Sequence, residues 1–514
     1  MRKQLFVAIL VCVFIVSSFT FSACHKHSTD EWISISAPNC TDDGLKVGVC
    51  SCGEELTEVT PAIGHDYQNG TCLKCGHKVS VGLEYFNYAD YCIVTGIGEC
   101  TDINVVIPSI HNGLPVKGID AEAFCGCKTI EGITIPKSVS KIDNLAFYYC
   151  ENLLNVTIEG SPFICSAAFE GTAYYNNPDN WQNDVLYIGK CLIKAKREIS
   201  SCTIKPDTTV IATQSFSFCK EIRSITVPES VEIICDYAFA DAENLTSITI
   251  QGNPQFGTEV FRNSGYFRRT KNWQDGMLYL GNYLVKVDPS VKNCTIKEST
   301  THILADAFSS CNQLKNITIP ASVTYIGDSP FYLCTELLSI DVASGNKNYQ
   351  SINGVLYTKD GKTLIQYPAG KYAEKFVIPS SVQVIADGAF ADADCLDIEF
   401  HDGIKHIGSY AFFQSSIQSL VIPTKITRIE YGTFRLCSNL FDVTIPANVK
   451  YIREYAFKGS DHIDVTFADK DGWYCILGVT NGIKDIYQLP INDSPMSIDT
   501  YLNKTYSDYD WIKK

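Results

Sequence analysis

The sequence predicts a repeat solenoid of parallel β-strands with short helical turns, an α/β solenoid, preceded by a small cysteine-rich N-terminal module. The first observation behind this fold class is that ITIP at 133, ITVP at 225 and ITIP at 317 are spaced 92 residues apart, which is four times 23. The second is that phenylalanine returns at steps of 22 or 23 residues over most of the same region. A period of about 20 to 30 residues is typical of solenoids, in which each unit buries its apolar side by stacking on its neighbours.

Each repeat unit reads as a short strand, a stop and a return segment. In SITVP the apolar Ile225 and Val227 alternate with polar residues, so one side of a short strand faces the core. Pro228 ends the strand because proline lacks the N–H that a ladder needs. Phe239 in the return segment fills the interior, and its equivalents should stack along the axis. The phenylalanines of this series are Phe124, Phe147, Phe169, Phe216, Phe239, Phe261, Phe308, Phe331, Phe390, Phe412, Phe434 and Phe457.

A small residue stands three positions after each of these phenylalanines. Cysteine exchanges there with alanine, serine and threonine inside the same chain, so the position selects for small volume, and its cysteines are expected to act as buried apolar residues. These cysteines are Cys127, Cys150, Cys219, Cys311, Cys334 and Cys437. We therefore expect no functional thiol in this column.

The first 23 residues have the layout of an export signal. Two basic residues precede an apolar run, and small residues stand before Cys24. The segment FSAC resembles a bacterial lipobox, with Phe21 where leucine is usual, and this resemblance implies lipidation of Cys24. A plain transmembrane anchor and a cleaved signal without lipid are the alternatives. With lipidation, residues 24–39 form a tether that holds the exported chain to a membrane at the bacterial cell surface.

Residues 40–80 form a module rich in cysteine, histidine and glycine. Cys50 and Cys52 make a CxC pair, and Cys72 and Cys75 make a CxxC pair about 20 residues later. Thiolates in two tight turns at this spacing reach one tetrahedral Zn²⁺, so the four cysteines are candidate ligands of a structural zinc. Further donor residues nearby are Cys40, His65 and His77. Disulfide bonds, which are usual outside a cell, and unpaired thiols are the alternatives that the sequence leaves open.

Longer stretches of the repeat region resemble a known family. LTSITI, IPASVTYIGDSPFYLCTELLSI and VIPSSVQVIADGAF are similar to the BspA-like leucine-rich repeat, and the resemblance covers roughly residues 100–467. It implies a right-handed leucine-rich-repeat solenoid at residues 105–467 and a role in cell-surface binding or adhesion. Residues 81–104 are then expected to cap its N-terminal end. The tail from DGWYCI to YLNKTYSDYDWIKK resembles the segment that closes such arrays, which assigns residues 468–514 to a C-terminal cap.

Composition and motifs argue against several classes of protein. The chain has a formal net charge of -15 and no cluster of lysine and arginine, which argues against binding to nucleic acid or to an anionic membrane surface. Hydrophobic residues make up 45% of the chain, enough to bury a large core. The motifs HExxH and GxSxG are absent, so no catalytic residue is assigned and we do not expect an enzyme.

Two sets of residues are candidates for ligand binding. A column of threonines recurs on the 23-residue lattice and should lie on the exposed side of the strands, although threonine also favours strands for steric reasons alone. Two insertions, AYYNNPDNW and GYFRRTKNW, each end in a tryptophan that would either stack on a ligand or cover the side of the solenoid. The candidate residues are Thr203, Thr226, Thr249, Thr295, Thr318, Trp181 and Trp273.

The resulting functional hypothesis is a lipid-anchored surface protein with a long binding face. Roughly 15 to 16 coils, spaced about 4.8 Å apart, give a strand face on the order of 70 Å long. Such a face suits an extended protein or polysaccharide partner, such as a host matrix protein, better than a small metabolite. A structural spacer or envelope scaffold without a dedicated ligand is the alternative, and an enzyme is a distant third.

Overall fold

The chain divides into two units, residues 1–78 and 79–514. The computed structural model describes residues 32–40, 44–49, 55–60, 67–68, 70–88, 91–460, 463–480, 483–488, 502, 507–509 and 511–513. The signal of residues 1–23 and three cysteines named from the sequence, Cys24, Cys50 and Cys52, lie outside the described residues.

The described part of the first unit contains two small antiparallel sheets. They are the sheet β1 (Trp32–Ser36), β2 (Gly44–Val49) and β3 (Glu55–Thr60), and the hairpin of β4 (Tyr67–Gln68) and β5 (Thr71–Cys72). All five residues of β1 are exposed. Among the described residues of this unit, only Cys40 and Cys72 are buried apolar side chains. This unit therefore has almost no hydrophobic core in its described part.

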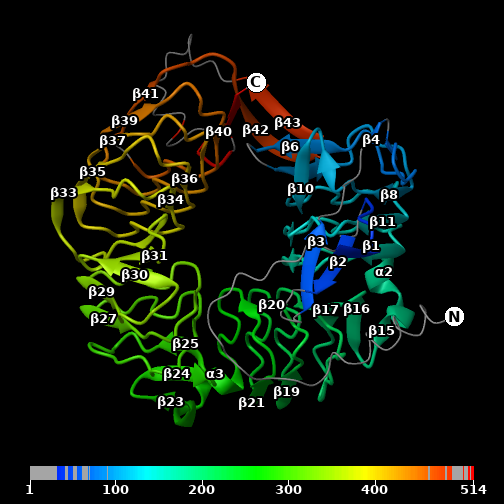
Figure 1. The fold of residues 1–514 in the computed structure, drawn as a ribbon, viewed down its shortest axis with the longest axis horizontal. Coiled ribbons are helices and arrows are strands. Elements are labelled where there is room, and N and C mark those ends of the chain that lie inside the picture. The colour runs from blue at the N-terminus through cyan, green and yellow to red at the C-terminus, as the bar shows by residue number, and fades with distance from the viewer. Residues whose placement is uncertain are drawn as a thin grey trace. The chain divides into compact units, whose positions relative to one another are not determined.

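In the second unit, successive coils contribute short strands to two series of parallel ladders (Figure 1). The first series contains the ITI-type strands. Its four sheets are β8 (Asn104–Val106), β11 (Gly132–Ile135) and β13 (Asn155–Ile158); β19 (Ser224–Val227) and β21 (Ser247–Ile250); β27 (Asn316–Ile319) and β29 (Ser339–Val342); and β33 (Ala373–Val377), β35 (Cys395–Glu399), β37 (Ser419–Val421), β39 (Asp442–Ile445) and β41 (Asp464–Phe467). Strands β19 and β21 pair residue for residue at a spacing of 23, as the sequence lattice predicts.

The second series consists largely of two-residue strands, extended at several points by antiparallel strands. Its sheets are β6 (Glu84–Asn87), β7 (Cys92–Gly96), β9 (Ile110–His111), β10 (Leu114–Ile119), β12 (Lys141–Ile142) and β14 (Phe163–Ile164); β15 (Trp181–Gln182), β16 (Val185–Ile188), β17 (Cys191–Ala195), β18 (Val210–Ile211), β20 (Ile233–Ile234) and β22 (Gln255–Phe256); β23 (Trp273–Gln274), β24 (Met277–Leu280), β25 (Tyr283–Val287), β26 (His302–Ile303) and β28 (Tyr325–Ile326); β30 (Tyr349–Ile352), β31 (Val355–Thr358), β32 (Thr363–Gln366), β34 (Val384–Ile385) and β36 (His406–Ile407); and β38 (Arg428–Ile429), β40 (Tyr451–Ile452), β42 (Trp473–Thr480), β43 (Ile483–Gln488) and β44 (Trp511–Lys513). The predicted parallel solenoid, of about 16 turns, is thus confirmed.

The return segments are turns, and helices are minimal. Among the described residues of the second unit, the α- and 3-10 helices are α2 (Ala173–Asn176), α3 (Gly265–Arg268), η1 (Pro178–Asn180) and η2 (Thr270–Asn272). Around Phe239 the chain turns at Tyr237 and Asp241, whose φ angles are 53° and 57°. Left-handed residues at this spacing prevent a helix from propagating. The short helical turns expected from the sequence are therefore mostly non-helical turns.

The interior is a stack of aromatic rings, as the sequence predicts. All twelve repeat phenylalanines are buried. Those of adjacent coils stack with ring centroids 5.0 to 5.7 Å apart. Tyr367 takes the place of phenylalanine in one coil, 5.3 Å from Phe390. Because this spacing is close to the separation of about 4.8 Å between paired strands, the ladders set the distance between the rings.

The column of small residues beside this stack also forms hydrogen bonds. Cys150, Cys334 and Cys437 each donate an S–H bond of 2.9 to 3.1 Å to the carbonyl of the phenylalanine one coil earlier. Ser460 donates its hydroxyl to the equivalent carbonyl at 2.8 Å. No disulfide bond joins any of these repeat cysteines to another described residue. The position therefore selects for a small side chain and, where that side chain is cysteine or serine, also supplies a donor.

Two hairpins, β16-β17 and β24-β25, interrupt the first series of sheets. Tyr187 of the first hairpin accepts the backbone N–H of Lys205 at 3.3 Å, a group that a neighbouring strand would otherwise bind. The ammonium of Lys205 lies 4.1 Å from the same ring. Thr203 consequently lies outside any strand, and Thr295 does so after the second hairpin, where the same contacts recur. The prediction of an uninterrupted threonine column on strands is wrong at these two positions.

Antiparallel strands lie at both ends of the second unit. Strand β7 pairs with β6 in an antiparallel manner and with β10 in a parallel manner. At the other end, β44 pairs in an antiparallel manner with both β40 and β42. None of the helices in the described part of the chain is long and apolar enough to cross a membrane.

Candidate functional site

The five-stranded sheet β33-β35-β37-β39-β41 presents the widest strand face of the first series. Its side chains alternate between the core and the outside, as the two-residue period of a strand requires. The inward residues are Phe376, Ile398, Leu420, Val443 and Val465. The outward residues form two rows, Lys375, Asp397, Ser419, Asp442 and Asp464, and Val377, Glu399, Val421, Thr444 and Thr466. We refer to these outward residues as the β33–β41 face.

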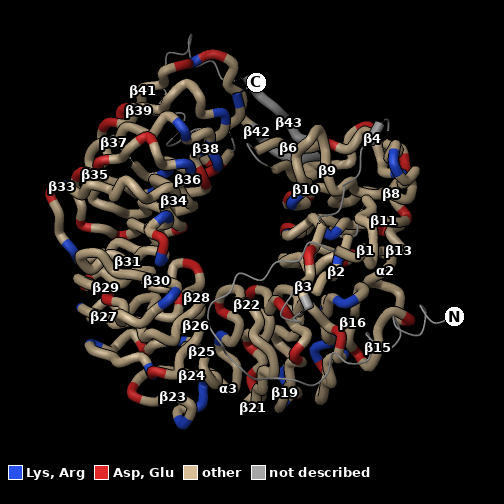
Figure 2. The backbone as a smooth tube through the Cα atoms, viewed as in Figure 1, with Lys and Arg blue, Asp and Glu red and all other residues tan. Residues whose placement is uncertain are grey.

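The β33–β41 face carries more negative than positive charge, and Figure 2 shows acidic positions beside β35 and β39. The ammonium of Lys375 lies 2.7 Å from a Glu399 carboxylate oxygen and 3.7 Å from one of Asp397. The hydrogen bond and charge of Glu399 raise the pKa of Lys375. Asp442 and Asp464 are register partners on adjacent strands, and neither forms an ion pair with any described residue. Since like charges side by side repel, this end of the face favours a cationic partner.

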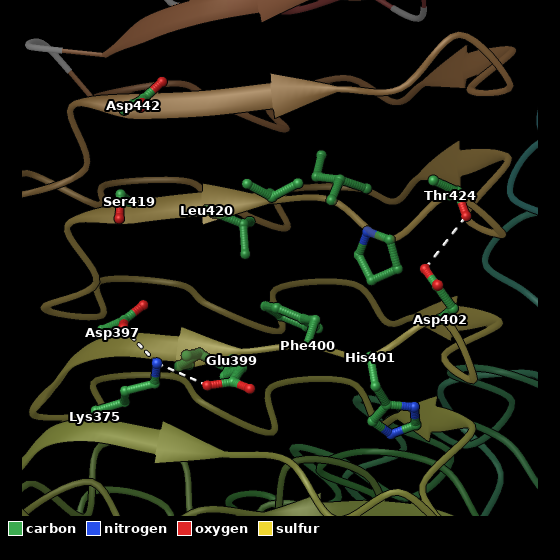
Figure 3. A pocket seen from close by; sticks show the side chains of 14 residues that line it. Lys375, Asp397, Glu399, Phe400, His401, Asp402, Ser419, Leu420, Thr424 and Asp442 are labelled. Atoms are coloured by element: carbon green, nitrogen blue, oxygen red, sulfur yellow. Dashed lines mark hydrogen bonds and ion pairs between the residues drawn. The ribbon is translucent and has the colours of Figure 1, made fainter.

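A hollow of about 350 Å³ opens in the β33–β41 face between β35 and β37 (Figure 3). The two strands share a single register pair, Asp397 with Ser419, whereas β33 and β35 share four. Val421, which is 70% exposed, lines the hollow together with acidic side chains that include Asp402 and Asp442. The opened ladder therefore combines an apolar surface with carboxylates in one place.

A histidine forms one wall of the hollow, at a position where several other repeats have proline. His401 occupies the place that Pro423 holds 22 residues later. Its Nδ1 accepts the N–H of Gly403 at 3.0 Å, so Nε2 carries the proton and donates to the carbonyl of Pro379 at 3.0 Å. A Cβ on Gly403 would come within 2.7 Å of the ring. These contacts tie the wall of the hollow to the preceding coil.

The remaining threonines of the predicted column lie on strands. Thr226 and Thr249 are exposed register partners on β19 and β21. Thr318 is exposed on β27, opposite Asp341. The structure thus brings Thr226 and Thr249 together on paired strands, whereas Thr203 and Thr295 lie outside any strand.

The two candidate tryptophans are half-buried and close their own insertions. The indole N–H of Trp181 donates to the carbonyl of Tyr175 at 2.8 Å, and the two rings pack edge to face at 5.3 Å. Trp273 repeats both contacts with Phe267, at 2.7 Å and 5.4 Å. These bonds fix the orientation of each indole, and part of each ring stays exposed.

The surroundings of the two tryptophans differ. Trp181 lines a hollow of about 450 Å³ together with Lys196, Arg197 and Phe218. The ammonium of Lys196 lies 5.6 Å from the Trp181 ring, and Arg197 lies 5.6 Å from the ring of Phe218. The residues 92 positions later than these three are Asp288, Pro289 and Ser310. The aromatic and basic surroundings are therefore confined to the first of the two insertions.

The cysteines of the first unit gather differently from the set named in the sequence. Cys72 and Cys75 come together with Cys40, and the three Sγ atoms all lie within 4.8 Å of one another. Cys50 and Cys52 lie outside the described residues. Sequence reasoning placed Cys40 only nearby, because it stands 32 residues before Cys72 and has no partner in a local motif.

The repeats match a known family over most of the second unit. The BspA type leucine rich repeat region, with six copies, matches residues 99–183, 162–268, 272–357 and 369–471. The chain belongs to the BspA-type leucine-rich repeat family. This match confirms the resemblance predicted from the repeats. No curated protein matches this BspA-type chain.

Several solved structures of bacterial leucine-rich repeat proteins are similar to the BspA-type chain. A leucine-rich repeat protein from Eubacterium ventriosum is 23% identical, with 54% of this chain and 77% of that chain covered and a TM-score of 0.33. The pneumococcal vaccine antigen PcpA is 19% identical, with 77% of this chain and 82% of that chain covered and a TM-score of 0.32. A leucine rich cell surface protein from Faecalibacterium prausnitzii is 21% identical, with 76% of this chain and 94% of that chain covered and a TM-score of 0.30.

Proposed function

We propose that this BspA-type protein is exported, held to a membrane by a lipid on Cys24, and binds an extended segment of a protein partner through the β33–β41 face. The hollow between β35 and β37 carries this proposal, because it opens on a strand face whose carboxylates at Asp442 and Asp464 have no described cation. The role is adhesion or interaction at the cell surface.

The dimensions and chemistry of the face favour a polypeptide with basic side chains. Five strands separated by about 4.8 Å span about 19 Å, which an extended segment of about six residues crosses. Val377 and Val421, 57% and 70% exposed, offer apolar contact. The carboxylates of Asp402 and Asp442 offer charge to lysine or arginine. Complementary charge of this kind sets specificity and the rate of association, and buried apolar contact adds affinity.

The binding proposal is tested with the full chain on an array of extracellular-matrix proteins and glycans. We expect saturable binding to at least one matrix protein, and a loss of affinity of about tenfold or more in the double variant Asp402→Lys with Asp442→Lys. The control is Asp207→Lys with Glu229→Lys, which makes the same change in net charge at two exposed positions in earlier coils, outside the β33–β41 face. The control should bind as the unmodified chain does.

Other outcomes would assign the function elsewhere. Binding that survives Asp402→Lys with Asp442→Lys would contradict the β33–β41 face. Loss of binding on Thr226→Lys with Thr249→Lys, with the acidic face intact, would assign the site to the threonine pair. Binding to glycans alone would favour a polysaccharide partner, and an array with no saturable binding would favour the structural spacer.

The hollow at Trp181 supports a second candidate site, one that stacks a sugar ring or a planar side chain on the indole. The chain supplies its own control, because Trp273 makes the same structural contacts without the basic and aromatic neighbours. Binding at this site should be lost in Trp181→Ala and kept in Trp273→Ala. Equal behaviour of the two variants would contradict a site at Trp181.

The lipid anchor is tested by replacing the cysteine that would carry it. We expect Cys24→Ala to lose incorporation of a labelled fatty acid and its stable partition into membranes, because lipid chains supply the anchoring free energy. The control is Cys12→Ala, which removes a thiol from the apolar run of the same signal. Unchanged labelling and partition in Cys24→Ala would refute the lipoprotein assignment.

A further inference from the structure

Two of the clustered thiols in the first unit are held by a tight turn. In the CxxCG segment, the N–H of Gly76 donates to the carbonyl of Cys72 at 2.8 Å, and the N–H of Cys72 donates to the carbonyl of His77 at 2.8 Å. Gly76 has a φ of 73°, a left-handed conformation that favours glycine. The turn begins at Cys72, the last residue of β5, and brings the thiols of Cys72 and Cys75 close together.

The third thiol comes from a distant part of the sequence. Cys40 follows β1, and its Sγ lies 3.9 Å from the Sγ of Cys72. Cys40 and Cys72 are buried, and Cys75 is exposed. A disulfide bond needs about 2.05 Å between the sulfur atoms. Thiolates on a tetrahedral zinc lie about 2.3 Å from the ion, which places them about 3.8 Å apart. The observed separation therefore fits two ligands of one ion.

The described part of the first unit shows little hydrophobic stabilisation. Its described part buries no apolar side chain other than Cys40 and Cys72. Ile33, Ile35 and Val59 are each more than half exposed. Small domains that bury so little surface are usually held by disulfides or by a structural metal ion. The cluster of Cys40, Cys72 and Cys75, with Sγ atoms within 4.8 Å of one another, has the geometry of such a metal site.

We propose that Cys40, Cys72 and Cys75 form a thiolate site for a structural Zn²⁺ that holds the first unit together. Through Cys40, the site would link the loop after β1 to the CxxC turn of Cys72 and Cys75. We expect zinc because tetrahedral sites made of thiolates bind it in preference to harder divalent ions such as Mg²⁺ and Ca²⁺. Three thiolates leave one position of the tetrahedron for a fourth donor.

Proton release accompanies binding at this site. An ordinary cysteine thiol has a pKa of about 8.5 and is mostly protonated at neutral pH. Zinc binds thiolates, so it displaces this proton, and its affinity should fall as the pH falls.

The first test measures zinc in the full chain purified under reducing conditions and supplied with zinc alone. Elemental analysis should find about one ion per chain. Cys40→Ser, Cys72→Ser and Cys75→Ser should each lower the affinity for zinc by about tenfold or more. The control is Cys125→Ser, which changes a half-buried thiol of the solenoid and should leave zinc binding unchanged. Full zinc binding in Cys40→Ser, with loss in Cys50→Ser and Cys52→Ser, would overturn the proposal.

The second test needs no variant and so does not depend on whether the variants fold. The full chain is alkylated with or without a chelator, and the modified cysteines are identified by peptide mass spectrometry. Zinc should protect Cys40, Cys72 and Cys75 together, and the chelator should expose Cys75 first because it is the exposed member. Equal alkylation of the three thiols with and without zinc, or a disulfide between any two of them in the purified protein, would overturn the site.

Discussion

Replacing Phe308 with alanine is expected to lower the free energy of unfolding of its coils by about 3 to 5 kcal/mol, because the change empties a buried site that neighbouring coils cannot close. Phe308 is fully buried and stacks on Phe331 at a centroid distance of 5.0 Å. Strands β26 and β28 and their ladder keep the coils at a fixed spacing. The cavity is therefore expected to persist, and its cost includes lost dispersion contacts.

The matched control for Phe308→Ala changes a smaller side chain in the same coil pair. Cys334→Ala removes an S–H bond of 3.1 Å to the carbonyl of Phe308 and should cost within about 1 kcal/mol. Alanine already occupies the equivalent position at Ala242 and Ala393. Hydrogen exchange of the amides in residues 302–342 measures both variants. Equal losses would show that the cysteine does more than fill space and donate one bond.

The fold was predictable because solenoid periodicity repeats the same information many times. Each strand motif and each interior phenylalanine confirms the spacing of the next, so the stack from Phe124 to Phe457 follows from arithmetic on the sequence. The turns were less predictable. Their left-handed residues include Tyr237 and Phe218, and these residue types do not by themselves indicate such a backbone.

The site was less predictable because it arises where the repeat departs from its own pattern. Thr203 fits the lattice, but the hydroxyl of Tyr187 accepts the backbone N–H of Lys205, and Thr203 lies outside any strand. The hollow in the β33–β41 face depends on an opened ladder, and the sequence gives no clear sign of it, because Glu159, Gln251 and Ala343 also replace proline at the position of His401. Cys40 gave no local signal, since a contact across 32 residues requires the fold of the first unit.

The C-terminal strands illustrate how such an array ends. Strand β44 runs antiparallel between β40 and β42, so it covers the last parallel strand with a reversed one. The N–H of Lys513 donates to the carbonyl of Lys450 at 3.0 Å. Trp473 and Trp511 are buried with ring centroids 6.5 Å apart and belong to the core cluster that begins at Val355. Strand β44 therefore pairs with the backbone groups at the edge of β40, which could otherwise pair with another chain.

Replacing Trp511 with alanine should therefore destabilise the last coils by about 3 to 5 kcal/mol and leave the first coils nearly unchanged. The effect on the interior stays local because the core cluster of Trp511 does not extend to the residues before Val355. The first strands also touch the last coils, where the rings of Phe86 and Tyr451 lie 4.0 Å apart, but this contact does not include Trp511. Hydrogen exchange should become faster at residues 428–475 and stay the same at residues 132–158. Trp181→Ala is the control, since that indole is half-buried and its loss should affect only the first hairpin. A uniform increase in exchange along the whole solenoid after Trp511→Ala would mean that the array unfolds as one cooperative unit, and that the C-terminal strands stabilise every coil and not only the last ones.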